Sequence, residues 1–200
     1  MENFIKKEEL IKESIRGITS LDFMGNQDKV DIILTYKQFK PAGKIELFFK
    51  PGYKSYSEQD FETNIEKVEK IFKDLSLPYE LEISKEKDFH IAVFYIGKDS
   101  ECRDRIKRAF SEKDNNRKDL IAGKELGYPS TAIEGYRNRK IKKFNSLPEE
   151  VRNSEYIKFL NFQLSEDHWE EEFETVKERA DELQKISPDL YQKIVAVDKK

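Results

Sequence analysis

The sequence has one cysteine, two histidines and no long apolar run. Because Cys102 has no second cysteine to pair with, the chain forms no internal disulfide, and nothing in it requires an oxidising compartment. Its apolar runs are far shorter than the roughly 20 residues that span a bilayer. The first residues lack the apolar core of a signal peptide. We therefore expect a cytoplasmic protein without a membrane partner.

Signatures of catalysis and metal binding are also scarce. His90 and His168 are far apart in the sequence, and no Ser-His-Asp or Cys-His arrangement follows from the spacing. His168 and Glu171 are three residues apart and share a helix face, but a metal site needs further ligands. We predict no catalytic residue, no metal and no cofactor, and the sequence favours binding over catalysis.

Charged and aromatic residues are abundant instead. Of 200 residues, 38% are charged and 37% hydrophobic, and 14 Phe and 9 Tyr supply a core. The charges are unevenly distributed: residues 103–143 carry 13 basic and 6 acidic side chains, whereas the segments before and after are net negative. A positive middle of this kind is typical of a polyanion-binding surface, unless the acidic C-terminal part folds back and masks it.

The periodicity predicts an α+β fold. Four segments alternate apolar and polar residues as strands with one buried face do: 29–37, 44–50, 79–84 and 89–97. The first two are predicted to form a hairpin, and the last, apolar at nearly every position, is predicted to lie at the sheet centre. The α-β-β-α-β-β order indicates a four-stranded antiparallel sheet with helices on one face.

Helical patterns fill the rest of the chain. They cover residues 2–16, 58–75, 100–112, 117–126, 129–143, 149–161, 166–186 and 188–197. We place an α+β domain at 1–113 and a helical region at 117–200, which either packs on that domain or forms a small second one.

The stretch Glu125–Lys140, ELGYPSTAIEGYRNRK, predicts a corner between two helices. Gly127 suits a left-handed residue after a helix, and Pro129 suits the first turn of the next. The spacing of Gly123, Gly127, Ile133 and Tyr136 resembles the helix-turn-helix family. That resemblance implies a close helix contact, a positive φ in the turn and two buried residues in a DNA-reading helix.

The same corner also resembles a group of prokaryotic proteins of unknown function that share a Leu-Gly-Tyr-Pro helix junction. In that group small residues or cysteines follow the proline. Here Ser130, Thr131 and Ala132 follow, so no metal or redox role is carried over.

These features predict a non-enzymatic binding protein, associated with nucleic acid or with another protein through the basic region 103–143. The residues expected to contact nucleic acid are Ser130, Thr131, Arg137, Arg139, Lys140, Lys142 and Lys143. Two alternatives stay open. One is a small enzyme or ligand binder with a site near Lys98, His90 and His168. The other is a structural subunit that pairs through helix 166–186.

Overall fold

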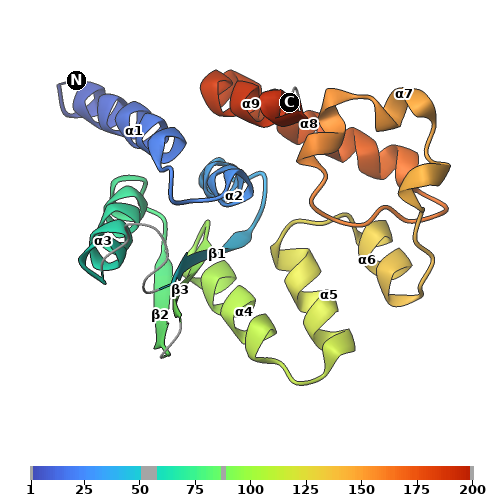
Figure 1. Cartoon of the computed structure of the whole chain (residues 1–200), viewed down its shortest axis with the longest axis horizontal. Coiled ribbons are helices and arrows are strands. Elements are labelled where there is room, and N and C mark those ends of the chain that lie inside the picture. Colours follow the sequence, from blue (N-terminus) through green and yellow to red (C-terminus); the bar gives the residue numbers. More distant parts are fainter. Residues whose placement is uncertain (1, 51–57, 87–88, 199–200) are drawn as a thin grey trace.

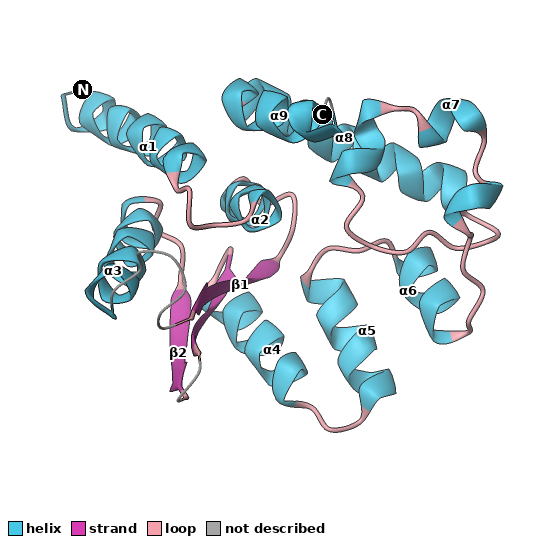
Figure 2. Cartoon of the chain, viewed as in Figure 1, coloured by secondary structure: helices cyan, strands magenta, loops and turns pink. Residues whose placement is uncertain are grey.

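The computed structural model describes residues 2–50, 58–86 and 89–198 and has an α+β architecture (Figure 1). One antiparallel sheet has the order β1-β3-β2, with β1 at Ala42–Phe49, β2 at Tyr79–Lys85 and β3 at His90–Gly97. The apolar strand β3 is central, as predicted. The sheet has three strands rather than the predicted four (Figure 2).

The missing strand is a helix. Residues 29–37 fall largely within α2, Asn26–Tyr36, so the segment that follows is not a hairpin loop. All residues from Lys29 to Thr35 are buried. A helix that is buried on every side needs no polar stripe, and its sequence therefore has no helical period. The β-branched residues of this segment then mimic strand alternation.

The other helices are α1 (Glu2–Ser20), α3 (Glu58–Asp74), α4 (Ser100–Ser111), α5 (Asn115–Glu125), α6 (Ser130–Arg137), α7 (Glu149–Arg152), α8 (Trp169–Ile186) and α9 (Pro188–Val195). The described residues also form 3-10 turns at η1 (Phe144–Ser146), η2 (Glu155–Phe159) and η3 (Ala196–Asp198). Three predicted helices are shorter than expected: 129–143 ends at Arg137, 149–161 is split between α7 and η2, and 166–186 begins at Trp169.

Helices cover both faces of the sheet, not one as predicted. On one face Ile45, Phe94 and Ile96 belong to a core that also includes residues of α1, α2, α3, α8 and α9. On the other face, Tyr95 packs with Cys102 and Ile106 of α4. The helices that follow α4 extend from the sheet as a corner, α5 and α6, and return to the main core through α8 (Figure 1).

No helix in the described part of the chain is long and apolar enough to cross a membrane.

Candidate nucleic-acid interface

The corner between α5 and α6 has the local geometry that the sequence predicts. Gly127 has a φ of +73°. A Cβ atom added to Gly123 would lie 2.8 Å from the side chain of Ile133, so the two helices approach closely at this glycine. Tyr136 does not occupy the predicted buried position, because 47% of its surface is exposed. The ring is therefore available to a ligand.

Apart from Arg137, the last residue of α6, the basic residues after the corner lie in a turn and an extended segment rather than on a helix. Arg139 has a φ of +59°, and the Lys140 N–H donates to the carbonyl of Gly135 at 2.8 Å. This 6→1 bond is the pattern that closes a helix end. A Cβ added to Gly135 would lie 2.6 Å from Ser165 Cβ, so this face of α6 packs against the protein.

Two backbone hydrogen bonds attach the basic segment to the residues that precede α8. The Lys142 N–H donates to the Leu164 carbonyl at 2.8 Å, and the Glu166 N–H donates to the Lys140 carbonyl at 3.1 Å. Ile141 and Ser165 form an isolated antiparallel bridge between these bonds. The segment therefore holds a defined path across the surface.

The seven predicted contact residues lie around α6 and the segment that follows it. Ser130 and Thr131 begin α6, and Arg137 ends it. Arg137, Arg139, Lys140 and Lys143 are exposed, whereas Lys142 is half-buried with its ammonium 5.4 Å from the centre of the Trp169 ring. Lys140 lies 3.9 Å from Asp167. Arg137, Arg139 and Lys143 form no ion pair with any residue that the structure describes.

The other half of the predicted basic region, on α4 and α5, is partly compensated within the protein. Four of its cations form the ion pairs Arg103–Asp104, Arg105–Glu125, Lys107–Glu82 and Arg117–Glu112. The Lys118 ammonium lies over the ring of Phe110. The partners come from α4 and its C-cap residue, from α5 and from β2, not from the acidic C-terminal part. Arg108, Lys113 and Lys124 are exposed and form no ion pair within the described residues. The half after α6 differs in that its unpaired cations lie between two exposed aromatic rings.

Two exposed aromatic rings flank this positive segment, a feature the sequence reasoning missed. Tyr136 precedes it, and Phe144, 52% exposed, follows it. Beside Phe144 lies a hollow of about 310 Å³, lined partly by Lys142, Lys143 and Leu164. The helix-turn-helix resemblance implied that Tyr136 is buried, and aromatic residues near helices usually pack inward. In the sequence, the run of basic residues between the two rings was the feature that could have indicated their exposure.

The residues of the alternative ligand site do not come together around one cavity. His90 begins β3 and Lys98 directly follows its end, so the eight-residue strand separates them by roughly 25 Å. His90 packs on the rings of Phe49 and Phe61. His168 precedes α8, 3.7 Å from Glu171. Within the described residues no group of three or more His, Cys, Asp or Glu side chains is arranged to hold a metal ion.

A cluster of charged residues, Asp31, Lys40 and Arg179, packs against the corner at Gly127. Lys40 is 1% exposed, and its Nζ lies 2.8 Å from Asp31 Oδ1, an ion-pair distance without the alignment of a hydrogen bond. Arg179 of α8 donates to the carbonyl of Gly127. Burial lowers the pKa of Lys40, while Asp31 acts in the opposite direction. Burial, and then the charge of Asp31, raises the pKa of Tyr128 to about 12.

Asp28 belongs to the same cluster and gives it a pH dependence. Burial, followed by repulsion from Asp31 and Glu46, raises the pKa of Asp28 from 3.8 to about 6. Between these values the folded chain binds more protons than the unfolded chain, so this group makes stability fall as the pH rises.

We expect Asp28→Asn to raise the free energy of unfolding at pH 7 by about 1 kcal/mol, after allowance for partial solvent exposure. The gain is expected to disappear near pH 4, where the native carboxyl is already protonated. Urea denaturation at the two pH values measures it. Asp189→Asn is the matched control, because Asp189 also lies in a first helical turn but is exposed. An equal gain at both pH values would contradict the assignment.

Comparisons with protein-family models, with curated proteins and with solved structures gave no match to this chain. Its function is therefore inferred from the geometry alone.

Proposed function

We propose that the chain binds single-stranded nucleic acid through the segment 136–144. The observation that carries the proposal is the row of exposed cations flanked by exposed rings: Tyr136, Arg137, Arg139, Lys140, Lys143 and Phe144. Proteins that bind single strands combine cations that follow the phosphates with aromatic rings on which bases stack. Each stacked base contributes about 1–3 kcal/mol.

Three cations supply the phosphate contacts in this proposal. Arg137, Arg139 and Lys143 form no internal ion pair within the described residues, while Lys140 is partly compensated by Asp167. The Lys142 ammonium already lies over Trp169, so its role is to hold the segment in place.

Ser130 and Thr131 lie at the opposite end of α6 from Arg137. At 1.5 Å per residue this end is about 10 Å away. Their hydroxyl groups are therefore suited to a neighbouring phosphate rather than to the one held by the cations.

A single strand fits this surface better than a duplex read by a helix-turn-helix. Base reading in the major groove depends on side chains such as Arg, Lys, Asn and Gln along the exposed face of a helix. In the first turn of α6 the exposed residue is Ser130. The face of α6 that carries Gly135 packs against Ser165. Arg139, Lys140 and Lys143 follow the end of α6, in a turn and an extended segment. Cations placed in this way contact the phosphates of a nucleic acid more readily than the edges of its bases.

The proposal is tested by fluorescence anisotropy with labelled single-stranded DNA, single-stranded RNA and duplex DNA at two salt concentrations. Reversing Arg137, Arg139 and Lys143 to Glu is expected to weaken single-strand binding at low salt about 30-fold or more, because three phosphate contacts become repulsive. The slope of log affinity against log salt should decrease by about 2. Phe144→Ala should weaken single-strand binding about tenfold and leave duplex binding unchanged.

The matched control reverses Lys6, Lys7 and Lys12, which are exposed on α1 and change the net charge equally. An equal loss of binding in this control would mean that net charge, not the segment, is responsible. Absence of binding by the native chain at low salt would refute the proposal. Tighter binding to one duplex sequence than to single strands would favour the helix-turn-helix instead.

A further inference from the structure

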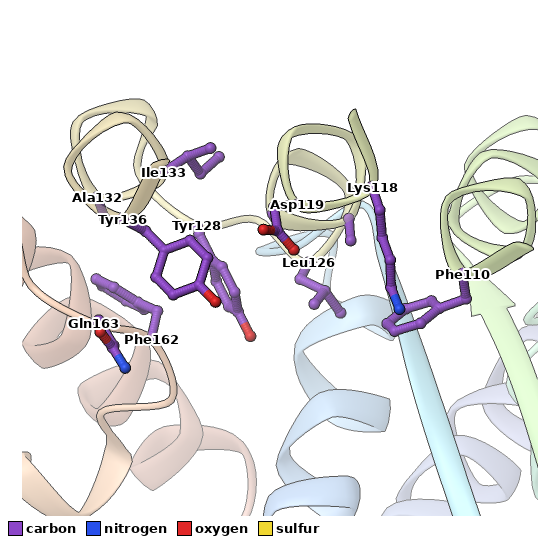
Figure 3. A pocket seen from close by; sticks show the side chains of 12 residues that line it. Phe110, Lys118, Asp119, Leu126, Tyr128, Ala132, Ile133, Tyr136, Phe162 and Gln163 are labelled. Carbon is purple, nitrogen blue, oxygen red and sulfur yellow. The ribbon is translucent and has the colours of Figure 1, made fainter. Parts of the chain in front are cut away.

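A second site lies on the inner side of the corner, where residues of α5, α6 and the segment around Phe162 line a cavity of about 280 Å³ (Figure 3). Its walls include Leu126 and Ile133. Three aromatic rings, Tyr128, Tyr136 and Phe162, line one side, and the Tyr128 and Phe162 ring centres are 5.3 Å apart. The cavity is small, so it suits a ligand of few atoms.

One carboxylate projects into this aromatic cavity. Figure 3 shows Asp119 of α5 with its carboxylate directed towards the rings of Tyr128 and Tyr136. Asp119 is half-buried, and it forms neither an ion pair nor a hydrogen bond with any residue in the described ranges. The neighbouring Lys118 points away from it and places its ammonium 5.5 Å from the centre of the Phe110 ring. Lys118 also lines the cavity, but its ammonium lies at the Phe110 side, away from the three rings that Asp119 faces.

This combination selects for an organic cation. The faces of aromatic rings carry negative potential and attract cations, most strongly where water is excluded. The carboxylate adds a full negative charge, which disfavours anions. Hard metal ions require several oxygen ligands, and the cavity offers one carboxylate. Alkylated ammonium groups carry their charge on an apolar surface, and they suit apolar walls better than a strongly hydrated primary ammonium.

The corner keeps the cavity open before any ligand arrives. Gly123 allows α5 and α6 to meet at Ile133, and Arg179 holds the carbonyl of Gly127. The Tyr128 N–H donates to the Gly123 carbonyl at 2.9 Å, and its ring packs against Phe162, so Tyr128 is held on both sides. A preformed site of this kind loses little conformational entropy on binding.

We propose that the cavity binds a small molecule carrying an alkylated ammonium group, between the rings of Tyr128, Tyr136 and Phe162 and against the Asp119 carboxylate. The inference rests on other observations than the nucleic-acid proposal, namely the cavity and the Asp119 carboxylate, although the ring of Tyr136 belongs to both surfaces.

Calorimetric titration of the full chain tests it with choline and with 3,3-dimethylbutanol, the neutral isostere in which carbon replaces nitrogen. Choline is expected to bind about tenfold more tightly or better, because only the charged compound gains from the rings and the carboxylate. Asp119→Asn should reduce choline affinity about tenfold and leave the isostere unchanged. Glu134→Gln is the matched control, since Glu134 is exposed on α6 and does not line the cavity.

Thermal unfolding of each variant establishes that it is folded, and Asp119→Glu retains the charge if the Asn variant does not fold. Equal affinity for choline and its isostere would overturn the proposal. So would unchanged choline binding by the Asn variant, or no binding of choline to the native chain.

Discussion

Lys40→Met is expected to lower the free energy of unfolding by about 3 kcal/mol, because it leaves the buried carboxylate of Asp31 without its counter-ion. Methionine retains most of the side-chain volume, so the loss reports charge rather than a cavity. The pair is among the most buried in the described chain, with side-chain exposures of 1% and 11%. Gln27 also donates to Asp31, at 3.1 Å, which limits the loss to the lower part of the range for broken buried pairs.

Urea denaturation with fitted m-values measures the effect. Lys70→Met is the control: Lys70 also pairs with an aspartate, Asp74, but is 72% exposed, so a change within about 0.5 kcal/mol is expected. Adding Asp31→Asn to the Lys40→Met variant should recover part of the loss, because no unpaired charge then stays buried. A double variant less stable than Lys40→Met would show that the two residues do not act as a pair.

Glu172→Ala is expected to destabilise the fold by about 3 kcal/mol, because it leaves two buried donors without an acceptor. Glu172 is 1% exposed. Its carboxylate accepts hydrogen bonds from the N–H and the hydroxyl of Ser165, at 2.6 and 2.7 Å. Ser165 in turn forms the bridge with Ile141 that holds the basic segment. The substitution should therefore also loosen the proposed nucleic-acid interface.

Two measurements separate these consequences. Urea denaturation gives the stability loss, and limited trypsin digestion reports how often the basic segment opens, since its Arg and Lys residues are cleavage sites. Glu171→Ala is the control, because the adjacent Glu171 side chain is 83% exposed and a change within about 0.5 kcal/mol is expected. Faster cleavage at 137–143 in the Glu172 variant alone supports the role of Glu172 in positioning. Unchanged cleavage would mean that the segment is held by its backbone bonds alone.

The strands and helices with one buried face were predictable, because their apolar residues recur in the sequence with the period of a strand or a helix. Helix α3, strand β1 and central strand β3 were expected within one or two residues of their bounds. Helix α2 was not, because burial on all sides removes the period by which a helix is recognised. The sequence also did not predict the early end of α6. Arg139 adopts a positive φ, which is uncommon for an arginine.

Some features of the candidate site were likewise predictable from the sequence, and others were not. The glycine and proline of the corner and the run of cations after it are local features, and the sequence by itself determined them. Which cations are free was decided only by the tertiary structure, because the partners of Arg105 and Lys107 come from α5 and β2, 20 residues or more away.

The sequence also contained no sign that the rings of Tyr136 and Phe144 are exposed, or that Asp119 has no ion-pair partner among the described residues. Backbone conformation at glycine and proline is set by the residue itself. Burial and charge compensation depend on which distant segments meet, and only the packed chain fixes that.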